Sequence, residues 1–293
     1  MKLKEWGAFA LLGLIWGSSF LWIKIAVAEI GPFMLVAFRL LFGLVGLLII
    51  MRLQKQAFPR ERSLWLRFAF MGVFNTALPF VLISWGETKI DSGLASILNG
   101  TVPLFTIVIA HFGLHDEKIT LPRIGGLVVG FIGVVVLVSR DFGPEGLVGN
   151  VWGQLAVVAA SISYATAITF SRKYLRGQPP VLQSTLVLLV ADALVWLALP
   201  VAERPLHFPA LPLTWFAIVW LGLLGSCLAY LLFFYLNNVW GPTRASLVTY
   251  IFPVVGLFLG ILFLRETPDW HLLVGSALIV GGIGVVNLKF NAR

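Results

Sequence analysis

The residues best suited to chemistry in this chain are polar side chains placed just before a proline in a long apolar segment. In residues 94–117, Ser96 and Asn99 lie upstream of Pro103 at spacings that put them on one side of a helix. Proline lacks an N–H and clashes with the carbonyl four residues earlier, which here belongs to Asn99. A freed backbone carbonyl and an amide side chain therefore coincide. The combination predicts a kinked helix whose polar face binds a small molecule.

The same pattern recurs 150 residues later. In this second copy Ser246, Thr249 and Tyr250 precede Pro253, and the carbonyl that this proline frees belongs to Thr249. Pro103 and Pro253 are the expected bending points of the two helices. We treat this pair of polar, interrupted helices as the candidate binding site.

The composition indicates that these helices lie in a membrane. Hydrophobic residues make up 59% of the 293 residues and charged residues 12%, with a mean hydropathy of +0.96. Soluble domains average roughly 45–50% apolar and about 25% charged residues, and a water-soluble fold could not cover this much apolar surface. The single cysteine, Cys227, excludes an intramolecular disulfide, and the sequence shows no zinc-ligand cluster. We therefore expect no metal and no cofactor.

Apolar segments long enough to cross a membrane, about 20 residues each, occur ten times. They cover residues 6–28, 33–51, 65–86, 92–112, 121–139, 152–172, 182–201, 214–236, 243–264 and 270–288. The first follows two lysines but has no small-residue cleavage site, so we expect it to be a retained span and not a cleaved signal peptide. The short connections predict consecutive helices that alternate in direction and leave no room for a soluble domain.

The distribution of basic residues predicts the orientation. With the N-terminus in the cytoplasm, fifteen of the 21 lysines and arginines fall on the cytoplasmic side and five on the opposite side. Such a bias follows the positive-inside rule. Both termini are therefore expected in the cytoplasm. The net charge of +8 is explained without a nucleic-acid partner.

An internal repeat of five helices relates the two halves of the chain. At the offset of 150 residues Trp65 aligns with Trp215, and the acidic Asp116 falls on Glu266. An odd number of helices per unit makes the second unit cross the membrane in the opposite direction. Inverted repeats with interrupted helices near the midplane are typical of alternating-access transporters. We predict an all-α integral membrane protein, a 5+5 inverted repeat of ten transmembrane helices around a central cavity. The two units are residues 1–143 and 144–293.

Several short motifs, taken in order, resemble one family over essentially the whole chain. They are Ile15-Trp16-Gly17-Ser18-Ser19-Phe20, Pro32 with Arg39, Ser96 to Pro103, Asp116 or Glu117, Gly125 to Gly133, Pro253, Glu266, and Gly275 to Gly284. In this order they resemble the EamA-type exporters of the drug/metabolite transporter superfamily. The sixth span departs from the pattern, with Ser163-Tyr164-Ala165 where the first span has its Trp-Gly pair. The resemblance implies a basket of helices around a cavity lined mainly by spans 1, 3, 4, 6, 8 and 9, and it implies export of amino acids, other metabolites or drugs.

Polar residues on the other cavity spans complete the predicted site. Asn75 with Pro79, and Ser226 with Tyr230, are spaced four residues apart, so each pair shares one face of a helix. Tyr164 lies in mid-span, where its hydroxyl needs a partner. An alternative is that such groups only join helices, each hydrogen bond contributing about 0.6 kcal/mol. The remaining candidates are Trp16, Ser18 and Ser163.

Charged residues within or beside the spans have competing interpretations. Arg39 is expected to reach the membrane interface or to pair with a carboxylate such as Glu29, and Asp192 to be structural. Glu87 and Asp91 flank a short outer turn that we expect to be solvated, an external gate being the alternative. No mid-span acid occurs on the proposed cavity helices, which disfavours a dedicated proton carrier there and leaves exchange or uniport open.

His111 and His115 share a helix face beside Asp116 and form a possible metal site. Zinc sites use three or four ligands, and the sequence places no further ligand close to these residues. We therefore interpret the histidines as an interfacial pair.

These observations predict a secondary transporter of the bacterial inner membrane that exports small metabolites, most readily aromatic or apolar amino acids. The alternative within the same superfamily is an exporter of drugs or other amphipathic metabolites. An ion channel is less consistent with an inverted repeat. An enzyme is not expected, because the sequence has no HExxH motif and no matched intramembrane aspartates. Beyond its substrate and the lipid bilayer the chain is expected to need no partner, a monomer being the expectation and a dimer the alternative.

Overall fold

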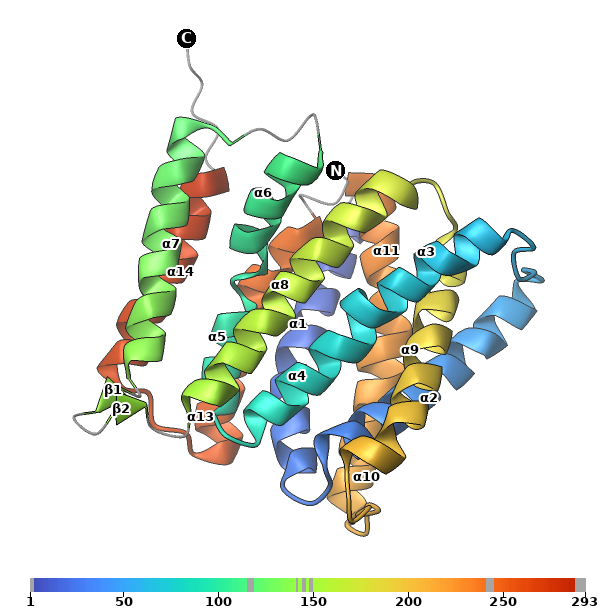
Figure 1. Cartoon of the computed structure of the whole chain (residues 1–293), viewed down its shortest axis with the longest axis horizontal. Helices are drawn as coiled ribbons and strands as arrows, with labels where there is room; N and C mark the ends of the chain where they lie inside the picture. The colour runs from blue at the N-terminus through green and yellow to red at the C-terminus, as the bar shows by residue number, and fades with distance from the viewer. Residues whose placement is uncertain are drawn as a thin grey trace.

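The computed structural model describes residues 3–114, 119–140, 142–143, 146–147, 150–240 and 245–287. Within these ranges the chain is helical apart from short connections and one two-stranded hairpin (Figure 1). The hairpin pairs β1 (Phe142–Gly143) with β2 (Gly146–Leu147), between the two predicted repeats. The all-α fold class is confirmed.

The helices of the first half correspond to five spans. They are α1 (Leu3–Val27), α2 (Pro32–Leu53), α3 (Arg62–Gly72) continued by η1 (Val73–Ala77) and α4 (Leu78–Glu87), α5 (Ser92–Asn99) followed by α6 (Val102–Gly113), and α7 (Leu121–Ser139).

The second half repeats this series. Its helices are α8 (Val151–Tyr174), α9 (Pro180–Ala202), α10 (Pro212–Val219) continued by η2 (Trp220–Leu228) and α11 (Ala229–Trp240), η3 (Ser246–Tyr250) followed by α13 (Ile251–Leu264), and α14 (Trp270–Asn287). Eight helical stretches of the described residues are long and apolar enough to cross a membrane, and residues 123–139 and 270–285 form two shorter apolar helices. These ten match the ten predicted spans.

Prolines explain where several helices begin. Pro32, Pro103, Pro180 and Pro212 each occupy one of the first two positions of their helix. At that position the missing N–H costs nothing, because the first N–H groups of a helix have no intrahelical partner. The same residue type that would break a helix in its middle therefore begins one here.

Two long spans are interrupted by π-helix at matching positions of the repeat. The π segment η1 covers residues 73–77 of the third span, and η2 covers residues 220–228 of the eighth. Adding the repeat offset of 150 to the first range gives 223–227, which lies inside the second. π-Bulges change the direction in which side chains point and occur frequently at functional sites. Both interruptions lie within their spans and not at the span ends.

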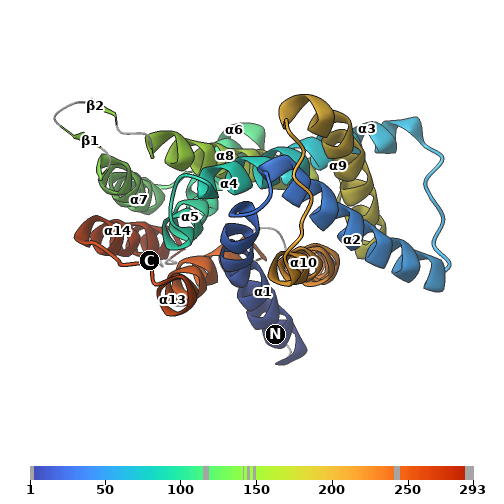
Figure 2. The same cartoon turned by 90° about the horizontal axis from the view of Figure 1, so that it is seen from below.

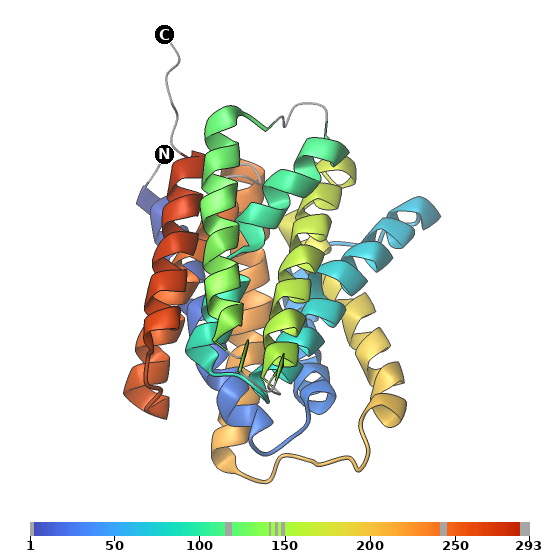
Figure 3. The ribbon, with the colours of Figure 1, turned by 60° about the vertical axis from the view of Figure 1, so that its left-hand side comes forward.

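Helix packing follows a pseudo-twofold arrangement. Each of the pairs α2 with α9, α5 with α13, and α7 with α14 joins helices that are equivalent in the repeat, and each pair is in contact. The pair α7 and α14 lies side by side in all three views (Figures 1, 2 and 3). Contacts across the halves also match, since α1 packs on α13 as α8 packs on α6. This is the packing expected of an inverted repeat.

Glycines allow α7 and α14 to approach closely. A Cβ on Gly282 would lie 2.5 Å from the backbone nitrogen of Gly130 and 2.6 Å from the carbonyl oxygen of Gly126. Real Cβ atoms do not come this close, so only glycine fits at position 282. Glycine at such crossings is how helices pack tightly in lipid. The neighbouring Gly281 has open space around its Cα and is exposed.

We predict that Gly282→Leu destabilises the protein and that Gly281→Leu does not. The first substitution forces the α7 backbone away, and overpacking of this kind costs about 1–3 kcal/mol. The effect is measured by heating the detergent-purified variants and recording, at each temperature, how much protein still elutes as a monodisperse peak on size exclusion. Equal melting temperatures for the two variants would contradict the packing described for this helix pair.

Candidate functional site

A central cavity of about 770 Å³, its open mouth included, lies between the two halves. The helices that line it are α1, α2, η1 with α4, α5, α6, α8, α11, η3 and α13, so both repeats contribute. Its wall consists of Trp16, Ser19, Phe20, Ile23, Arg39, Asn75, Phe80, Ile83, Asn99, Val102, Tyr164, Ile168, Tyr230, Phe233, Val248, Thr249 and Phe252.

The predicted helix interruptions lie at this cavity. Helix α5 ends at Asn99, and α6 begins at Val102 with Pro103 as its second residue. In the second half a 3₁₀ segment ends at Tyr250, and the α-helix that follows contains Pro253 as its third residue. Irregular backbone at membrane depth is tolerated where it borders a cavity. The two prolines are buried at the interruptions, where the bending points were expected.

Tyr230 is held rigidly by the π segment η1. Its hydroxyl lies 2.7 Å from Thr76 Oγ1, donates to the carbonyl oxygen of Asn75 at 3.1 Å, and accepts from Asn75 Nδ2 at 3.4 Å. The Tyr230 side chain is 2% exposed. The hydrogen bonds join α11 of the second half to η1 of the first. This tyrosine therefore shapes the cavity wall.

Tyr164 contrasts with Tyr230. It comes from α8, is only partly buried, and lines the same cavity. Its hydroxyl makes no hydrogen bond within the described residues. A phenol at an apolar wall normally finds a partner for its O–H. Tyr164 therefore offers a free donor and acceptor to a molecule in the cavity.

Arg39 is the cationic side chain that reaches the cavity wall. It is 3% exposed, donates through Nε to Ser226 Oγ at 3.1 Å, and donates through Nη2 to the carbonyl oxygen of Gly225 at 3.5 Å. Its guanidinium carbon lies 3.8 Å from the ring centroid of Phe80. No carboxylate within the described ranges lies at ion-pair distance, so its charge is free to attract an anionic group. The predictions that Arg39 reaches the interface or pairs with Glu29 were wrong.

Glu29 instead holds the beginning of α10. Its Oε1 accepts from the backbone N–H of Ala210 at 2.6 Å and of Leu211 at 3.0 Å. The hydrogen bond from the Thr214 side chain, and then that from Ala210, lower the pKa of this carboxyl. The Glu203 carboxylate acts reciprocally and accepts from the N–H of Phe33 at the start of α2, at 2.8 Å. Negative side chains at helix N-termini are favourable, which explains why these acids are not available to Arg39.

Aromatic rings form much of the remaining wall. The Trp16 ring centroid lies 5.4 Å from that of Phe233 and 6.1 Å from those of Tyr230 and Phe252. The Trp16 indole N–H donates to the carbonyl oxygen of Gly225 at 3.0 Å, which fixes the ring. Rings at these separations attract each other beyond the effect of burial. Trp16 Nε1 and Arg39 Nη2 donate to the same Gly225 carbonyl oxygen, so the wall presents a pre-formed apolar surface beside the arginine.

The structure brings six of the predicted site residues to the cavity wall. They are Trp16, Asn75, Asn99, Tyr164, Tyr230 and Thr249. They come from sequence positions up to 233 residues apart, between Trp16 and Thr249. Sequence spacing alone could not show that they meet.

Six other predicted residues lie outside the wall. Ser18 donates to the Ile15 carbonyl and Ser96 to the Gly93 carbonyl on their own helices, whereas Ser163 donates to the Phe74 carbonyl of η1. Buried Pro79 and half-buried Tyr250 are near it without lining it. Ser226 accepts from Arg39 and so acts through it. The side chain of Ser246 is outside the described residues.

Several wall residues were missed because they are apolar. Phe20 and Ile23 share a helix face with Trp16, at spacings of four and seven residues, and Phe233 follows Tyr230 by three. These spacings were visible in the sequence. What was not visible is which apolar face of each helix meets the cavity and which meets lipid.

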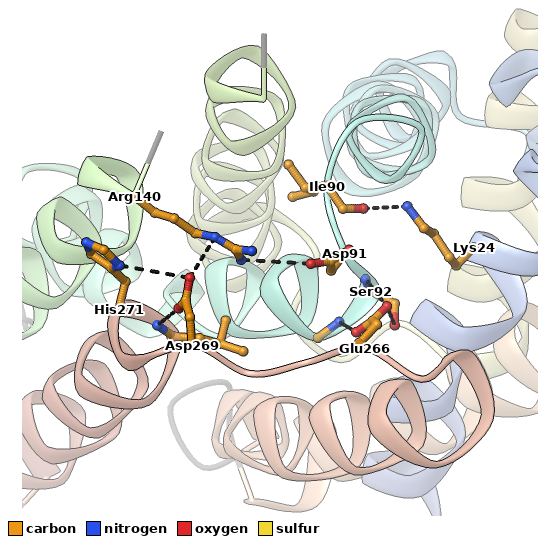
Figure 4. Close-up of polar contacts among 10 residues, drawn as sticks. Lys24, Ile90, Asp91, Ser92, Arg140, Glu266, Asp269 and His271 are labelled. Atoms are coloured by element: carbon orange, nitrogen blue, oxygen red, sulfur yellow. Dashed lines mark hydrogen bonds and ion pairs between the residues drawn. The ribbon is translucent and has the colours of Figure 1, made fainter. Parts of the chain in front are cut away.

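Charged and capping contacts gather at the end of the bundle where α4 meets α5 (Figure 4). A Glu266 oxygen accepts from the N–H and hydroxyl of Ser92, both at 2.7 Å, and the other oxygen accepts from the N–H of Gly93 at 2.9 Å. Arg140 pairs with Asp269 at 2.8 Å. An acid at the N-terminus of α5 satisfies N–H groups that have no helical partner. These contacts tie the two halves together at this end.

The remaining charged and metal candidates are placed away from the cavity wall. Asp192 is 7% exposed on α9 and is hydrogen-bonded to the Trp196 side chain. His111 Nδ1 accepts from the backbone N–H of Ile119 at 3.1 Å, while His115 and Asp116 lie outside the described residues. Within those residues no three His, Cys, Asp or Glu side chains form a metal-binding group.

Glu87 departs from the prediction made for it. The turn it begins was expected to be solvated, but Glu87 is 0% exposed. Asp91 on the same turn does follow the prediction, with its side chain 46% exposed. The difference arises because Glu87 is the last residue of α4 and faces the bundle.

Comparisons with known proteins agree with this architecture. The sequence profile of the EamA-like transporter family matches residues 5–139 and again residues 151–288. The uncharacterized transporter YoaV of Bacillus subtilis is 27% identical over 96% of this chain and 95% of its own length. The uncharacterized inner membrane transporter YedA of Escherichia coli K12 is 29% identical over 96% of this chain and 90% of its own length. A protein of known crystal structure shares the fold, with a TM-score of 0.73 at 21% identity over the whole of both chains.

The two cavity tyrosines should respond differently to loss of the hydroxyl. Tyr230→Phe leaves buried Thr76 and Asn75 without their partner, which costs about 1–3 kcal/mol. Tyr164→Phe removes a hydroxyl that has no hydrogen bond in the part of the chain that the structure describes. We predict a lower melting temperature for Tyr230→Phe and an unchanged one for Tyr164→Phe, measured in detergent on purified protein. A destabilised Tyr164→Phe variant would show that this hydroxyl is already engaged.

Proposed function

The chain belongs to the EamA-like transporter family, and from this premise we propose that it exports small metabolites across the bacterial inner membrane by alternating access. Its preferred substrates are amino acids with aromatic or apolar side chains. The observation that carries the proposal is a cavity enclosed by both repeats, with one unpaired arginine and an aromatic wall.

The cavity wall offers a partner for each of the two parts of such an amino acid. Arg39 has five N–H groups, of which two donate to Ser226 and Gly225, so three remain for a substrate carboxylate. Charge-assisted hydrogen bonds of this kind are about twice as strong as neutral ones. Trp16 and Phe233 supply the apolar surface for the side chain. The Tyr164 hydroxyl and the Asn99 amide complete the polar contacts.

The inverted repeat supplies the transport cycle. In this structure the halves are joined at one end through Glu266 and the start of α5. Because the second half repeats the first in the opposite direction, an exchange of packing between the halves closes the other end. The cavity then opens to the opposite side with its substrate in place.

We also propose an orientation in the membrane and a state of assembly. The excess of basic residues on one side supports cytoplasmic termini. The cavity is complete within one chain, so a monomer suffices for transport.

A second candidate function is export of drugs or other amphipathic metabolites. The aromatic wall supports it, because such surfaces accept many apolar groups. Arg39 restricts the range of such substrates, because a buried cation repels cationic drugs. Neutral or anionic compounds are therefore the members of this class to test.

The direct experiment is a panel of radiolabelled amino acids and amphipathic anions in proteoliposomes, with and without a pH gradient. We expect leucine and phenylalanine to be exchanged faster than lysine. Faster flux of lysine or of a cationic drug would contradict the proposal.

Arg39→Gln should reduce exchange of carboxylate substrates by about 10- to 100-fold, the loss expected when a charge-assisted hydrogen bond of about 1.5–3 kcal/mol disappears. Arg67→Gln is the matched control, since Arg67 on α3 is exposed, binds the Tyr174 carbonyl and does not line the cavity. Flux is compared at equal amounts of reconstituted protein. Equal flux in both variants would exclude Arg39 from substrate binding.

Tyr164→Phe should weaken substrate affinity several-fold while leaving the maximal exchange rate and the stability unchanged. A hydroxyl that contacts substrate contributes about 0.5–1.5 kcal/mol. Concentration dependence of exchange measures the effect. An unchanged affinity would place the substrate away from α8.

A further inference from the structure

Glu87 is a buried acid that the transport site described above does not use. It ends α4, is 0% exposed, and neither carboxylate oxygen has a hydrogen-bond partner within the described residues. Nearly all buried polar groups in proteins are satisfied, so an orphaned carboxyl needs an explanation. Other acids at this end, such as Glu266, accept several hydrogen bonds.

Glu87 lies just beyond the end of the cavity. Ile83, one helical turn earlier on the same face of α4, lines the cavity wall. Lys24 reaches the same place from α1, where its Nζ donates to the backbone carbonyls of Glu87 and Ile90, each at 2.7 Å. The lysine thus fixes the turn around Glu87 without pairing with its carboxylate.

The charges around Glu87 come from three other elements. Lys24 on α1, Arg39 on α2 and Glu266 after α13 act on it electrostatically. Asp91 on the same turn is partly exposed and lies 3.8 Å from Arg140. The other elements packed against α4 add no ionisable group here, since η1, α5 and residues 151–160 of α8 contain none.

This setting gives the carboxyl two usable charge states. With Glu87 ionised, Lys24 and Arg39 are balanced by Glu87 and Glu266. With Glu87 protonated, the group carries one net positive charge beside the cavity. A buried carboxylate without hydrogen bonds is retained in proteins only where nearby cations offset its desolvation, and both cations here are shared with other partners.

We propose that Glu87 is a proton-binding site of this carrier and that its ionised form competes with a substrate carboxylate for the positive field of Arg39. The second part of this statement rests on the proposed function. Binding of a carboxylate substrate then promotes proton uptake at Glu87, and the two are translocated together. Export of an accumulated metabolite down its own gradient would therefore carry protons out of the cell.

Infrared spectroscopy of the purified protein tests the proton site without any substrate. A protonated carboxyl has a carbonyl stretch that vanishes on ionisation. We expect a band in mildly acidic buffer that disappears in alkaline buffer, is absent from Glu87→Gln, and is retained in Asp91→Asn. The Asp91→Asn variant is a suitable control because it removes an acid four residues away that is solvated. All these proteins also carry Asp192→Asn, because Asp192 on α9 is another buried acid, and a titrating band that persists in Glu87→Gln then overturns the proposal.

Transport of radiolabelled leucine tests the competition. Counterflow in the wild-type protein should slow by up to about tenfold per pH unit once Glu87 is ionised, while Glu87→Gln should be active and independent of pH. Asp91→Asn should keep the wild-type pH dependence. A Glu87→Gln variant with the wild-type pH dependence overturns the competition between Glu87 and the substrate. Absence of leucine flux in every form of the protein overturns the proposed substrate instead. In that case the infrared result decides whether Glu87 is a proton site.

If Glu87→Gln does not fold, a measurement on the wild-type protein alone still tests whether substrate binding is coupled to proton uptake. Addition of leucine to protein in weak buffer with a pH indicator should produce proton uptake. Leucine binding without proton uptake over the whole range in which the carboxyl band titrates overturns the coupling.

Discussion

The crossing of α5 and α13 is the constraint on which the rest of the structure depends. A Cβ on Gly256 would lie 2.4 Å from both Cβ and Oγ of Ser96, and a Cβ on Gly100 would lie 3.1 Å from Cγ of Pro253. Only small residues allow backbones to come this close in lipid, where packing and not the hydrophobic effect drives helix association. The crossing joins equivalent helices of the two repeats. It therefore fixes the pseudo-twofold centre of the molecule.

The interruptions beside this crossing are possible because the protein satisfies their backbone groups. The carbonyl oxygen of Leu98 accepts from Thr101 Oγ1 at 2.5 Å and from Ser161 Oγ at 3.2 Å, where α5 ends. In a membrane an unsatisfied carbonyl is costly, so a helix ends at mid-depth only where side chains or a cavity replace the helical hydrogen bond. The hydroxyls of Thr101, between α5 and α6, and of Ser161 on α8 thus permit the break that exposes Asn99 to the cavity. The proline in the sequence, the hydroxyls packed against the break and the exposed Asn99 amide therefore depend on one another.

Much of this architecture could be predicted from the sequence. The apolar segments, the repeat offset and the two prolines gave the spans and the positions of the breaks, because these depend on local chemistry. The partners of Arg39 could not be predicted, since Ser226 lies 187 residues away and nothing local indicates which helix it meets. Glu87 was misjudged for a related reason. Its position at a helix end indicated exposure, whereas its burial depends on how α4 is tilted against α8 and α1.

In the proposed function one substrate site lies between the repeats, where Arg39, Trp16 and Phe233 line the same cavity. Photo-crosslinking in proteoliposomes with photo-leucine, an apolar amino acid that carries a diazirine, tests this most directly. Mass spectrometry of the labelled protein should locate the adducts on the cavity faces of α1, α8 and α11, and excess leucine should abolish them. Adducts confined to lipid-facing helices such as α3 or α7, or adducts that leucine does not displace, would contradict the account.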